Sequence, residues 1–347
     1  AAGLAALPLR AAEPAPRVAH PLGQHVLVSP ATQPAAFRYA AFPSLLRAGP
    51  DEVWLAFKAG RSHATDAGAA MEIVRHTLSS GATKLIQRLP APEPKIYQMG
   101  ELTRLPDGTI ALYLDVQSVG WDGRHYRSGA EAFRWDAEHG AFGAAETLPP
   151  INGVLYGYPF EFIHEGTTTW QLIMAFGYHQ PGGRWSVDVV RSGDSGRSWS
   201  FVRNLAAEFG GNRINESGFA RHGDGFIVTT RGYDRIARLH RTDGEFRVQQ
   251  QVDLSGKHPL IHDIVGRPRI FLRDGLGYLI GRNWTRPNRG ATSTPMQLCL
   301  IRFDPATLAV TSVVILDNAD NQRVTDGYYA VTTFTGWPDF ARSRIAR

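Results

Sequence analysis

Short runs of apolar residues recur along the chain, and pairs of these runs enclose a turn signal. In residues 42–60, FPSLLRAGPDEVWLAFKAG, the two runs lie on either side of Gly-Pro-Asp. The same form recurs around Pro-Asp-Gly, Glu-Gly, Gly-Asp-Gly and Asp-Gly in residues 97–116, 158–179, 215–232 and 267–283. Such turn sequences tolerate a positive φ, so each segment is predicted to form a β-hairpin. Long helical periodicity is hard to find after residue 20, and the pattern predicts an all-β fold.

The predicted hairpins begin at intervals of roughly 50–60 residues, a repetition that is typical of a β-propeller. Most units continue into a second apolar stretch, such as SVDVVRSGDSGRSWSF, which is interpreted as the outer hairpin of a four-stranded antiparallel blade. A sixth, shorter unit occupies residues 328–346, and an N-terminal strand near QHVLVSP would complete the last blade. The sequence therefore predicts six blades, with seven as the alternative.

Composition and charge narrow the class of protein. The chain has 347 residues, of which 43% are hydrophobic and 20% charged, as in ordinary globular proteins. The net charge of +5 favours an anionic ligand, whereas the basic residues form no run of the kind that binds nucleic acid. The single cysteine, Cys299, cannot form an intramolecular disulfide, and the sequence has no zinc-binding pattern. No metal or other cofactor is predicted, and the sequence indicates no oligomeric state.

The N-terminal residues differ from the rest of the chain. Residues 1–18 are rich in Ala, Leu and Pro and are interpreted as the remnant of a secretion signal or as a tail outside the fold. Residues 19–347 are expected to form a single propeller domain. No apolar run reaches the length of a membrane span. The sequence therefore predicts a secreted or periplasmic protein that does not span a membrane.

One turn has a distinctive spacing. In RSGDSGRSWSF, residues 191–201, the order is S-x-D-x-G-x-S-W, beginning at Ser192. Asp194 is expected to accept hydrogen bonds from turn amides, and Gly196 to supply an unusual backbone conformation. The ring of Trp199 is expected to pack against the blade. These roles are structural and not catalytic.

This spacing resembles the Asp-box of sialidases and related BNR-repeat proteins, and TLSSGATK and RTDGEFR resemble degenerate copies of it. The resemblance covers about residues 37–347 and implies a sialidase-like propeller. In that family an arginine-isoleucine-proline motif precedes a second arginine and an acidic residue. Here AFPSLL stands at the motif, so Ala41 occupies the place of the first arginine and the arginine triad is incomplete. Arg38 lies three residues earlier, where a bulged strand would bring it close.

The resemblance implies three catalytic residues. Asp66 has the spacing of the acid/base aspartate, Glu216 matches the glutamate of an N-E motif, and Tyr328 in DGYYAVTTFTG matches the nucleophilic tyrosine, with Tyr329 as the alternative. A phenol is a weak nucleophile at neutral pH, so Glu216 would take its proton while Asp66 protonates the leaving oxygen. Asp66 could instead be a turn acid, and Tyr328 a packing residue.

Arginines suit the carboxylate of an acidic sugar because they bind it bidentately. Arg231 follows Glu216 by 15 residues, the separation found in the family, and a hairpin would bring both to one mouth of the ring. The two could equally form a structural ion pair. The other candidates for substrate contact are Arg61, His63, Arg38, Tyr158, Glu161, Trp121 and Arg282, the last with Arg267 and Arg286 as competitors.

These features predict a secreted, sialidase-like exo-glycoside hydrolase that removes a terminal acidic sugar from a glycan or polysaccharide. One alternative is a propeller polysaccharide lyase that acts on uronate-containing glycans, for which His63, Tyr158 and Arg231 would supply the base and the carboxylate ligand. Another is a carbohydrate-binding propeller without catalysis, because fold alone does not prescribe chemistry.

Overall fold

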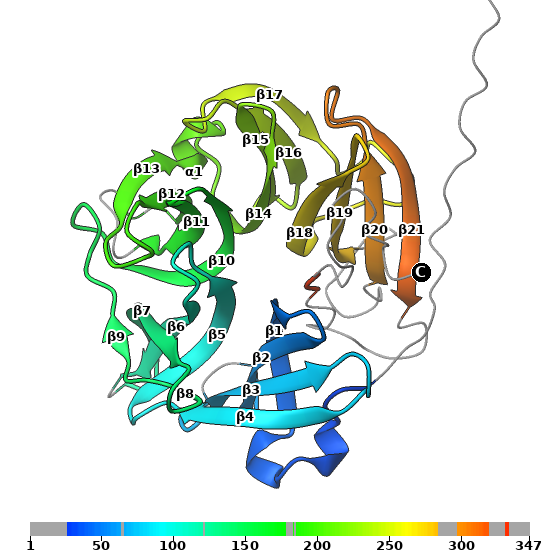
Figure 1. The fold of residues 1–347 in the computed structure, drawn as a ribbon. Coiled ribbons are helices and arrows are strands. Elements are labelled where there is room, and N and C mark those ends of the chain that lie inside the picture. Colours follow the sequence, from blue (N-terminus) through cyan, green and yellow to red (C-terminus); the bar gives the residue numbers. More distant parts are fainter. Residues whose placement is uncertain are drawn as a thin grey trace, which may run out of the picture.

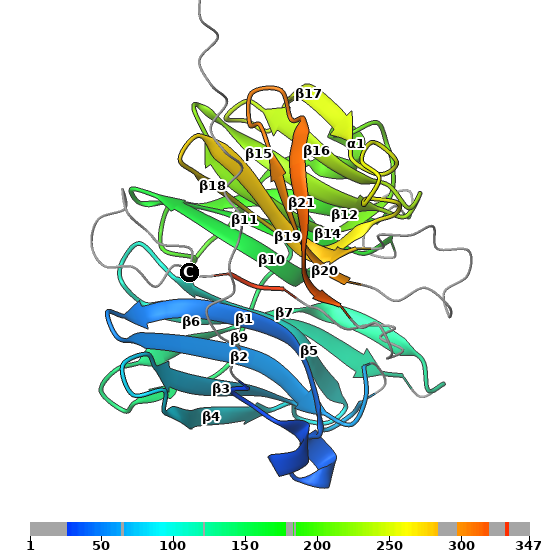
Figure 2. The same ribbon diagram turned by 90° about the vertical axis from the view of Figure 1, so that its right-hand side faces the viewer.

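Five antiparallel β-sheets are arranged in a ring in the computed structural model (Figure 1). The structure describes residues 26–63, 66–120, 122–177, 183, 185–283, 297–318 and 330–332. Consecutive sheets come from consecutive parts of the chain, and the strands pair in sequence order within each sheet, apart from β9, which pairs with β7. The sheets are the blades of a β-propeller, numbered 1 to 5 along the chain here, and Figure 2 shows them from the side.

The first strand of each blade is the innermost, and from blade 1 to blade 5 the first strands of blades that follow one another in the chain are in contact. Blade 1 consists of β1 (Tyr39–Gly49), β2 (Glu52–Gly60), β3 (Ala70–Thr77) and β4 (Thr83–Pro90). Blade 2 consists of β5 (Lys95–Arg104), β6 (Ile110–Val119), β7 (His125–Asp136), β8 (Ala141–Phe142) and β9 (Glu146–Thr147). Blade 3 consists of β10 (Tyr156–Glu165), β11 (Thr168–Ala175), β12 (Ser186–Ser192) and β13 (Ser200–Asn204). Blade 4 consists of β14 (Ile214–His222), β15 (Gly225–Gly232), β16 (Ala237–Thr242) and β17 (Val248–Asp253). Blade 5 consists of β18 (Val265–Arg273), β19 (Leu276–Asn283), β20 (Gln297–Phe303) and β21 (Val310–Asn318).

The number of blades corrects the expectation of six or seven, because the described residues form five sheets. The five hairpins predicted from the turn signals are the first two strands of these blades. The outer strand of blade 5, β21, follows β20 directly, so no N-terminal strand is needed to complete that blade. Residues 26–29 form no strand and lead into the 3₁₀ helices η1 (Pro30–Thr32) and η2 (Ala35–Phe37). The expected sixth unit lies outside the described residues except for 330–332, which form no strand.

The innermost strand of every blade departs from regular pairing near its start. The register shifts lie between Ala41 and Ser44, Tyr97 and Met99, Gly157 and Pro159, Ile214 and Ser217, and Gly266 and Arg269. In three blades the residue at the shift precedes a proline and has a positive φ: 55° for Phe42, 55° for Tyr158 and 44° for Arg267. A bulge bends its strand and re-aims the side chains there. The same irregularity thus recurs around one end of the ring axis.

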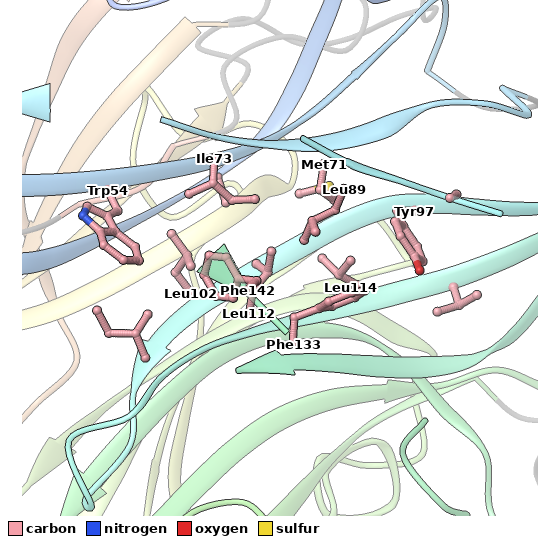
Figure 3. Packing of buried hydrophobic residues seen from close by; sticks show 14 residues of the cluster. Trp54, Met71, Ile73, Leu89, Tyr97, Leu102, Leu112, Leu114, Phe133 and Phe142 are labelled. Carbon is pink, nitrogen blue, oxygen red and sulfur yellow. The ribbon is translucent and has the colours of Figure 1, made fainter. Parts of the chain in front are cut away.

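Apolar side chains from facing sheets form the cores between blades. Between blades 1 and 2, Met71 and Leu112 are completely buried and Trp54 packs in the same cluster (Figure 3). The ring of Trp54 also meets that of Trp135 edge-on, with centroids 4.6 Å apart. Because both faces of an inner strand are covered, β6 is a nearly continuous apolar run and not an alternating one. The longest helix in the described residues is α1 (Leu205–Glu208), and none there is long and apolar enough to cross a membrane.

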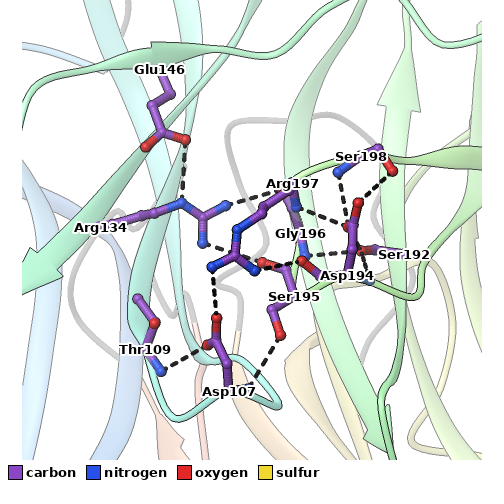
Figure 4. A network of polar contacts seen from close by, with 10 residues as sticks. All are labelled: Asp107, Thr109, Arg134, Glu146, Ser192, Asp194, Ser195, Gly196, Arg197 and Ser198. Atoms are coloured by element: carbon purple, nitrogen blue, oxygen red, sulfur yellow. Dashed lines mark hydrogen bonds and ion pairs between the residues drawn. The ribbon is translucent and has the colours of Figure 1, made fainter.

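Asp194 holds the turn between β12 and β13 (Figure 4). Its Oδ1 accepts hydrogen bonds from the amides of Arg197 (3.1 Å) and Ser198 (2.9 Å) and from the hydroxyl of Ser192 (2.8 Å). The hydroxyl of Ser198 donates to Oδ2 at 2.6 Å. These hydrogen bonds, those from Ser198 above all, lower the pKa of Asp194 to about 2. The carboxylate therefore organises the turn as an anion.

Gly196 and Trp199 attach this turn to blade 2. Gly196 has a φ of 72°, and a Cβ at this position would collide with the hydroxyl of Tyr113. The half-buried ring of Trp199 lies edge-on to Tyr113, with 6.0 Å between centroids. The carbonyl of Gly196 also accepts a hydrogen bond from Nη2 of Arg134 at 3.1 Å. The turn therefore fastens blade 3 to blade 2.

Candidate functional site

The two ends of the ring carry different residues. Antiparallel strands place the second-to-third connections of each blade, and the links between blades, at one end, which we call the upper face. Glu216 near the start of β14 and Arg231 near the end of β15 both belong to this face. The turn around Asp194 joins a third strand to a fourth and therefore lies at the opposite end. The turn is thus separated from the charged residues at the upper face.

Glu216 is the centre of an ion cluster at the upper face. Its Oε2 lies 2.6 Å from Nη1 of Arg231, and Nη2 of Arg282 lies 3.1 Å from each carboxylate oxygen. The backbone amide of Arg267 donates to Oε2 at 2.8 Å. Burial by itself raises the pKa of this carboxyl, but the guanidiniums of Arg282 and Arg231 hold it well below its usual range. Glu216 is therefore an anion that joins blades 4 and 5.

A second cluster connects blades 2, 3 and 5. Oε2 of Glu101 lies 2.7 Å from Nη2 of Arg269 and 2.9 Å from Nη2 of Arg267. Glu161 of β10 accepts a hydrogen bond from the amide of Phe219 at 2.9 Å and lies 3.3 Å from Nη1 of Arg269. Burial raises the pKa of Glu161 to about 7. A carboxyl group with such a pKa exchanges its proton near neutral pH, as acid–base catalysis requires.

Blades 2 and 3 contribute an arginine beside aromatic rings. Asp115 is buried, and its oxygens accept hydrogen bonds from Nη1 of Arg127 at 2.6 Å and from the amide of Tyr158 at 3.1 Å. The guanidinium carbon of Arg127 lies 4.6 Å from the ring centroid of Tyr158 and 4.3 Å from that of Phe176. The side chain of Arg127 is 26% exposed. The partly exposed guanidinium of Arg127 thus lies against the half-buried ring of Tyr158 and the buried ring of Phe176.

The loop between β2 and β3 is fixed by a buried lysine. Nζ of Lys58 donates to the carbonyls of Ser62 and His63 and to Oε1 of Gln98, each at 3.0 Å, and lies 3.9 Å from Oδ2 of Asp66. The same oxygen of Asp66 accepts the amide of Ser62 at 3.1 Å. Burial lowers the pKa of Lys58 to about 8, although Asp66 acts in the opposite direction. Asp66 is therefore bound within its own loop.

His63 links this loop to the Tyr158 region. Its Nδ1 lies 2.9 Å from the hydroxyl of Tyr39, and its ring centroid lies 5.1 Å from that of Phe42. Phe42 belongs to a small apolar cluster against which Tyr158 packs. His63 is half-buried. Blade 1 thereby joins the surface formed by blades 2 and 3.

The structure brings part of the predicted site together. Glu216, Arg231 and Arg282 are in direct contact, and the amide of Arg267 joins them. Glu161, Tyr158, His63 and Asp66 lie in the neighbouring clusters described above. Arg38 and Arg61 are exposed, and Asp66 binds the backbone amide of Arg61. The remaining candidates, Tyr328, Tyr329, Arg286 and Trp121, lie outside the described residues. In the described part of the chain, no three His, Cys, Asp or Glu side chains are grouped as metal ligands.

Comparison with known proteins finds solved structures with a similar fold. No family model and no curated protein matches the chain. A solved structure of a protein of unknown function from Dyadobacter fermentans is 15% identical and covers 86% of this chain and 87% of its own, with a TM-score of 0.66. The NanB sialidase from Streptococcus pneumoniae is 9% identical and covers 84% of this chain and 63% of its own, with a TM-score of 0.55. A GH32 β-fructofuranosidase from Bombyx mori is 12% identical and covers 82% and 66%, with a TM-score of 0.52.

These similarities concern the fold. The chain is similar in architecture to sialidases and to a GH32 glycoside hydrolase, and it spans less than two thirds of the length of either. At such identities a shared fold does not carry a shared reaction. The function therefore has to be argued from the side chains at the upper face.

Sequence reasoning missed several of those side chains. Lys58 in WLAFKAG and Asp115 in ALYLDV are single charges within otherwise apolar strands. A charge in such a position is buried, and a buried charge must be paired. This pattern could have marked both residues as members of an internal network. Arg127, in contrast, follows a loop of polar residues and has no such signal.

Proposed function

We propose that the protein is a glycoside hydrolase that removes a terminal acidic sugar from a glycan. The observation that carries this proposal is that two partly exposed arginines lie at the upper face, Arg231 paired with Glu216 and Arg127 over the ring of Tyr158. The buried Arg282 is paired with the same carboxylate as Arg231. Guanidiniums recognise a carboxylate with paired hydrogen bonds. An aromatic ring offers the apolar surface that a sugar ring covers. The sialidases and the GH32 hydrolase of similar fold support a glycosidase.

The side chains of Arg231 and Arg127 are partly exposed, so a ligand can reach them in this proposal. Arg231 directs Nη1 at Glu216, and its side chain is 27% exposed. Arg127 directs Nη1 at Asp115 and is similarly exposed. Each carboxylate therefore fixes the orientation of an arginine whose side chain stays partly exposed. Such preorganisation reduces the entropy lost when the substrate binds.

The role of Glu216 in the proposed reaction differs from the one expected from the sequence. Arg231, Arg282 and the amide of Arg267 all stabilise its carboxylate, which makes it a weak proton acceptor. Glu216 is here a positioning residue for the two arginines. The nucleophile of the proposal remains Tyr328. The Tyr328 oxygen bonds to the anomeric carbon as the glycosidic C–O bond breaks, Asp66 gives its proton to the leaving oxygen, and the phenol proton passes to solvent water. A water molecule then attacks the anomeric carbon and gives a proton to Asp66, and the released tyrosine oxygen takes up a proton from solvent.

The experiment is a turnover assay on aryl glycosides of sialic, glucuronic and galacturonic acids, with the neutral glucoside and galactoside beside them. We expect release of the aryl group from an acidic glycoside alone. Arg231→Ala should raise KM by at least about tenfold, and Asp66→Asn should lower kcat by about a hundredfold. Arg75→Ala is the control, because Arg75 is exposed on β3 away from the upper face.

Three results would overturn the proposal. If only neutral glycosides are cleaved, the proposal that the substrate is an acidic sugar is wrong. An unsaturated product that absorbs in the near ultraviolet, released from a uronate polysaccharide, would establish a lyase instead. Binding of acidic sugars without turnover in any assay would establish a binding propeller.

A further inference from the structure

We call Arg127, Arg231 and Arg282 with their carboxylate partners the arginine cluster. A second surface, on blades 3 and 4, borders this cluster. Trp185 directly precedes β12, and Tyr233 directly follows β15. Arg213 directly precedes β14, and Asn215 is the second residue of that strand. These positions belong to connections at the upper face. We call these four side chains the rim platform.

The platform is built from mutual contacts. The guanidinium carbon of Arg213 lies 5.1 Å from the ring centroid of Trp185 and 5.0 Å from that of Tyr233. The two rings meet at 83° with their centroids 5.5 Å apart. The amide of Tyr233 donates to the carbonyl of Arg213 at 2.9 Å, and Nδ2 of Asn215 donates to the hydroxyl of Tyr233 at 3.2 Å. The rings are therefore held in a fixed relation to each other.

The platform is continuous with the arginine cluster on two sides. The ring of Trp185 lies edge-on to that of Phe176, with the two centroids 5.7 Å apart. The guanidinium of Arg127 lies over the ring of Phe176. On the other side, Asn215 is the neighbour of Glu216 in the chain, and its Oδ1 accepts the amide of Glu216. A ligand that reaches from the cluster towards the rim would meet the platform next.

The exposure of these side chains distinguishes the platform from packing. Tyr233 is 44% exposed, Arg213 is exposed, and Trp185 and Asn215 are half-buried. Phe201, another exposed ring in the described part of the chain, lies on the outer strand β13. Accessible aromatic rings beside hydrogen-bonding groups are typical of binding sites, because the ring covers apolar area while the polar groups set orientation.

We propose that the rim platform binds the sugar that adjoins the terminal acidic sugar of the substrate. The rings of Tyr233 and Trp185 would cover the C–H face of that pyranose, and Arg213 and Asn215 would hydrogen-bond its hydroxyls. This inference rests on the proposed function, since the acidic sugar has to occupy the arginine cluster. It adds a preference for oligosaccharides over single sugars.

The test is a calorimetric titration of the full chain with acidic sugars alone and at the end of a disaccharide. The probes are sialic, glucuronic and galacturonic acids and their galactose-extended disaccharides, with sulfur as the glycosidic atom to prevent cleavage. We expect one disaccharide to bind about tenfold more tightly than its acidic sugar, a difference of about 1.4 kcal/mol. Tyr233→Ala and Trp185→Ala should remove this increment and leave the affinity for the single sugar unchanged.

Two further variants make the result specific. Tyr233→Phe keeps the ring and should keep the increment, whereas Phe201→Ala removes an exposed ring elsewhere and should change nothing. If the single sugar binds but the disaccharide gains nothing, or if the increment survives in both alanine variants, the platform inference is wrong and the proposed function stands. If no acidic sugar binds, both are wrong.

Discussion

Arg282 of blade 5 reaches Glu216 of blade 4, with its Nη2 3.1 Å from both carboxylate oxygens. Arg231 approaches the same carboxylate from within blade 4. One carboxylate thus holds two arginines from different blades, and both side chains of the inter-blade pair are almost completely buried. The contact between two blades and the charge at the upper face therefore depend on the same group.

We expect Glu216→Gln to reduce both stability and acidic-sugar binding. Removing one partner of a buried ion pair leaves the other charge uncompensated, which destabilises a protein by about 3–5 kcal/mol. Denaturant unfolding of the variant should show a loss of this size. Glu245→Gln is the matched control, because Glu245 is exposed and lies 4.0 Å from Arg191. Equal stability of the two variants would contradict the central place given to Glu216.

The acid side of the stability profile tests the same pair independently. The arginines depress the pKa of Glu216 in the folded state, so its contribution to stability is present above the ordinary carboxyl pKa of about 4.3 and is lost as the pH falls further. In Glu216→Gln, the free energy of unfolding should therefore fall less steeply as the pH is lowered through the acid range. If the variant loses stability with falling pH as steeply as the unmodified protein, other carboxyl groups determine the acid dependence and this prediction is wrong.

Lys58 predicts a dependence of stability on pH in the alkaline range. Burial lowers the pKa of Lys58 from 10.5 to about 8, so between these values the unfolded chain binds more protons than the folded one. Stability should therefore rise as the pH increases from 8 towards 10.5. Lys58→Met should remove this rise and loosen the loop that carries Asp66. Parallel denaturation series at pH 7 and pH 10 would measure it, and an identical pH dependence in the variant would refute it.

The sequence predicts local features of this fold well and long-range ones poorly. Turn residues between apolar runs located five hairpins, because a hairpin is decided by adjacent residues. The number of blades depends on how the ring closes, which no local pattern encodes. The Glu216–Arg231 contact was predictable from its spacing within one hairpin. Lys58 was missed because its partner Gln98 lies on the next blade, 40 residues away.

The turn around Asp194 should affect stability without affecting the upper face. Asp194→Ala removes the acceptor for two turn amides and two hydroxyls, and we expect a loss of about 1–2 kcal/mol. Binding at the upper face should be unchanged, because the turn lies at the other end of the ring. Thermal unfolding combined with sugar titration would check both parts. If the variant binds acidic sugars differently but keeps its melting temperature, the structural role given to Asp194 is wrong.

Gly266 should control the position of Arg282. A Cβ at residue 266 would lie 2.8 Å from Cγ of Arg282 and closer still to its Nε, so Gly266→Ala would displace the arginine from Glu216. We expect a loss of acidic-sugar affinity of about tenfold, because the displaced guanidinium no longer holds the carboxylate of Glu216 that orients Arg231. Gly49→Ala is the matched control, since a Cβ there meets its nearest neighbour, Cβ of Glu52, at an ordinary 3.6 Å. If the two glycine variants bind acidic sugars equally, Arg282 is a structural partner of Glu216 and takes no part in recognition.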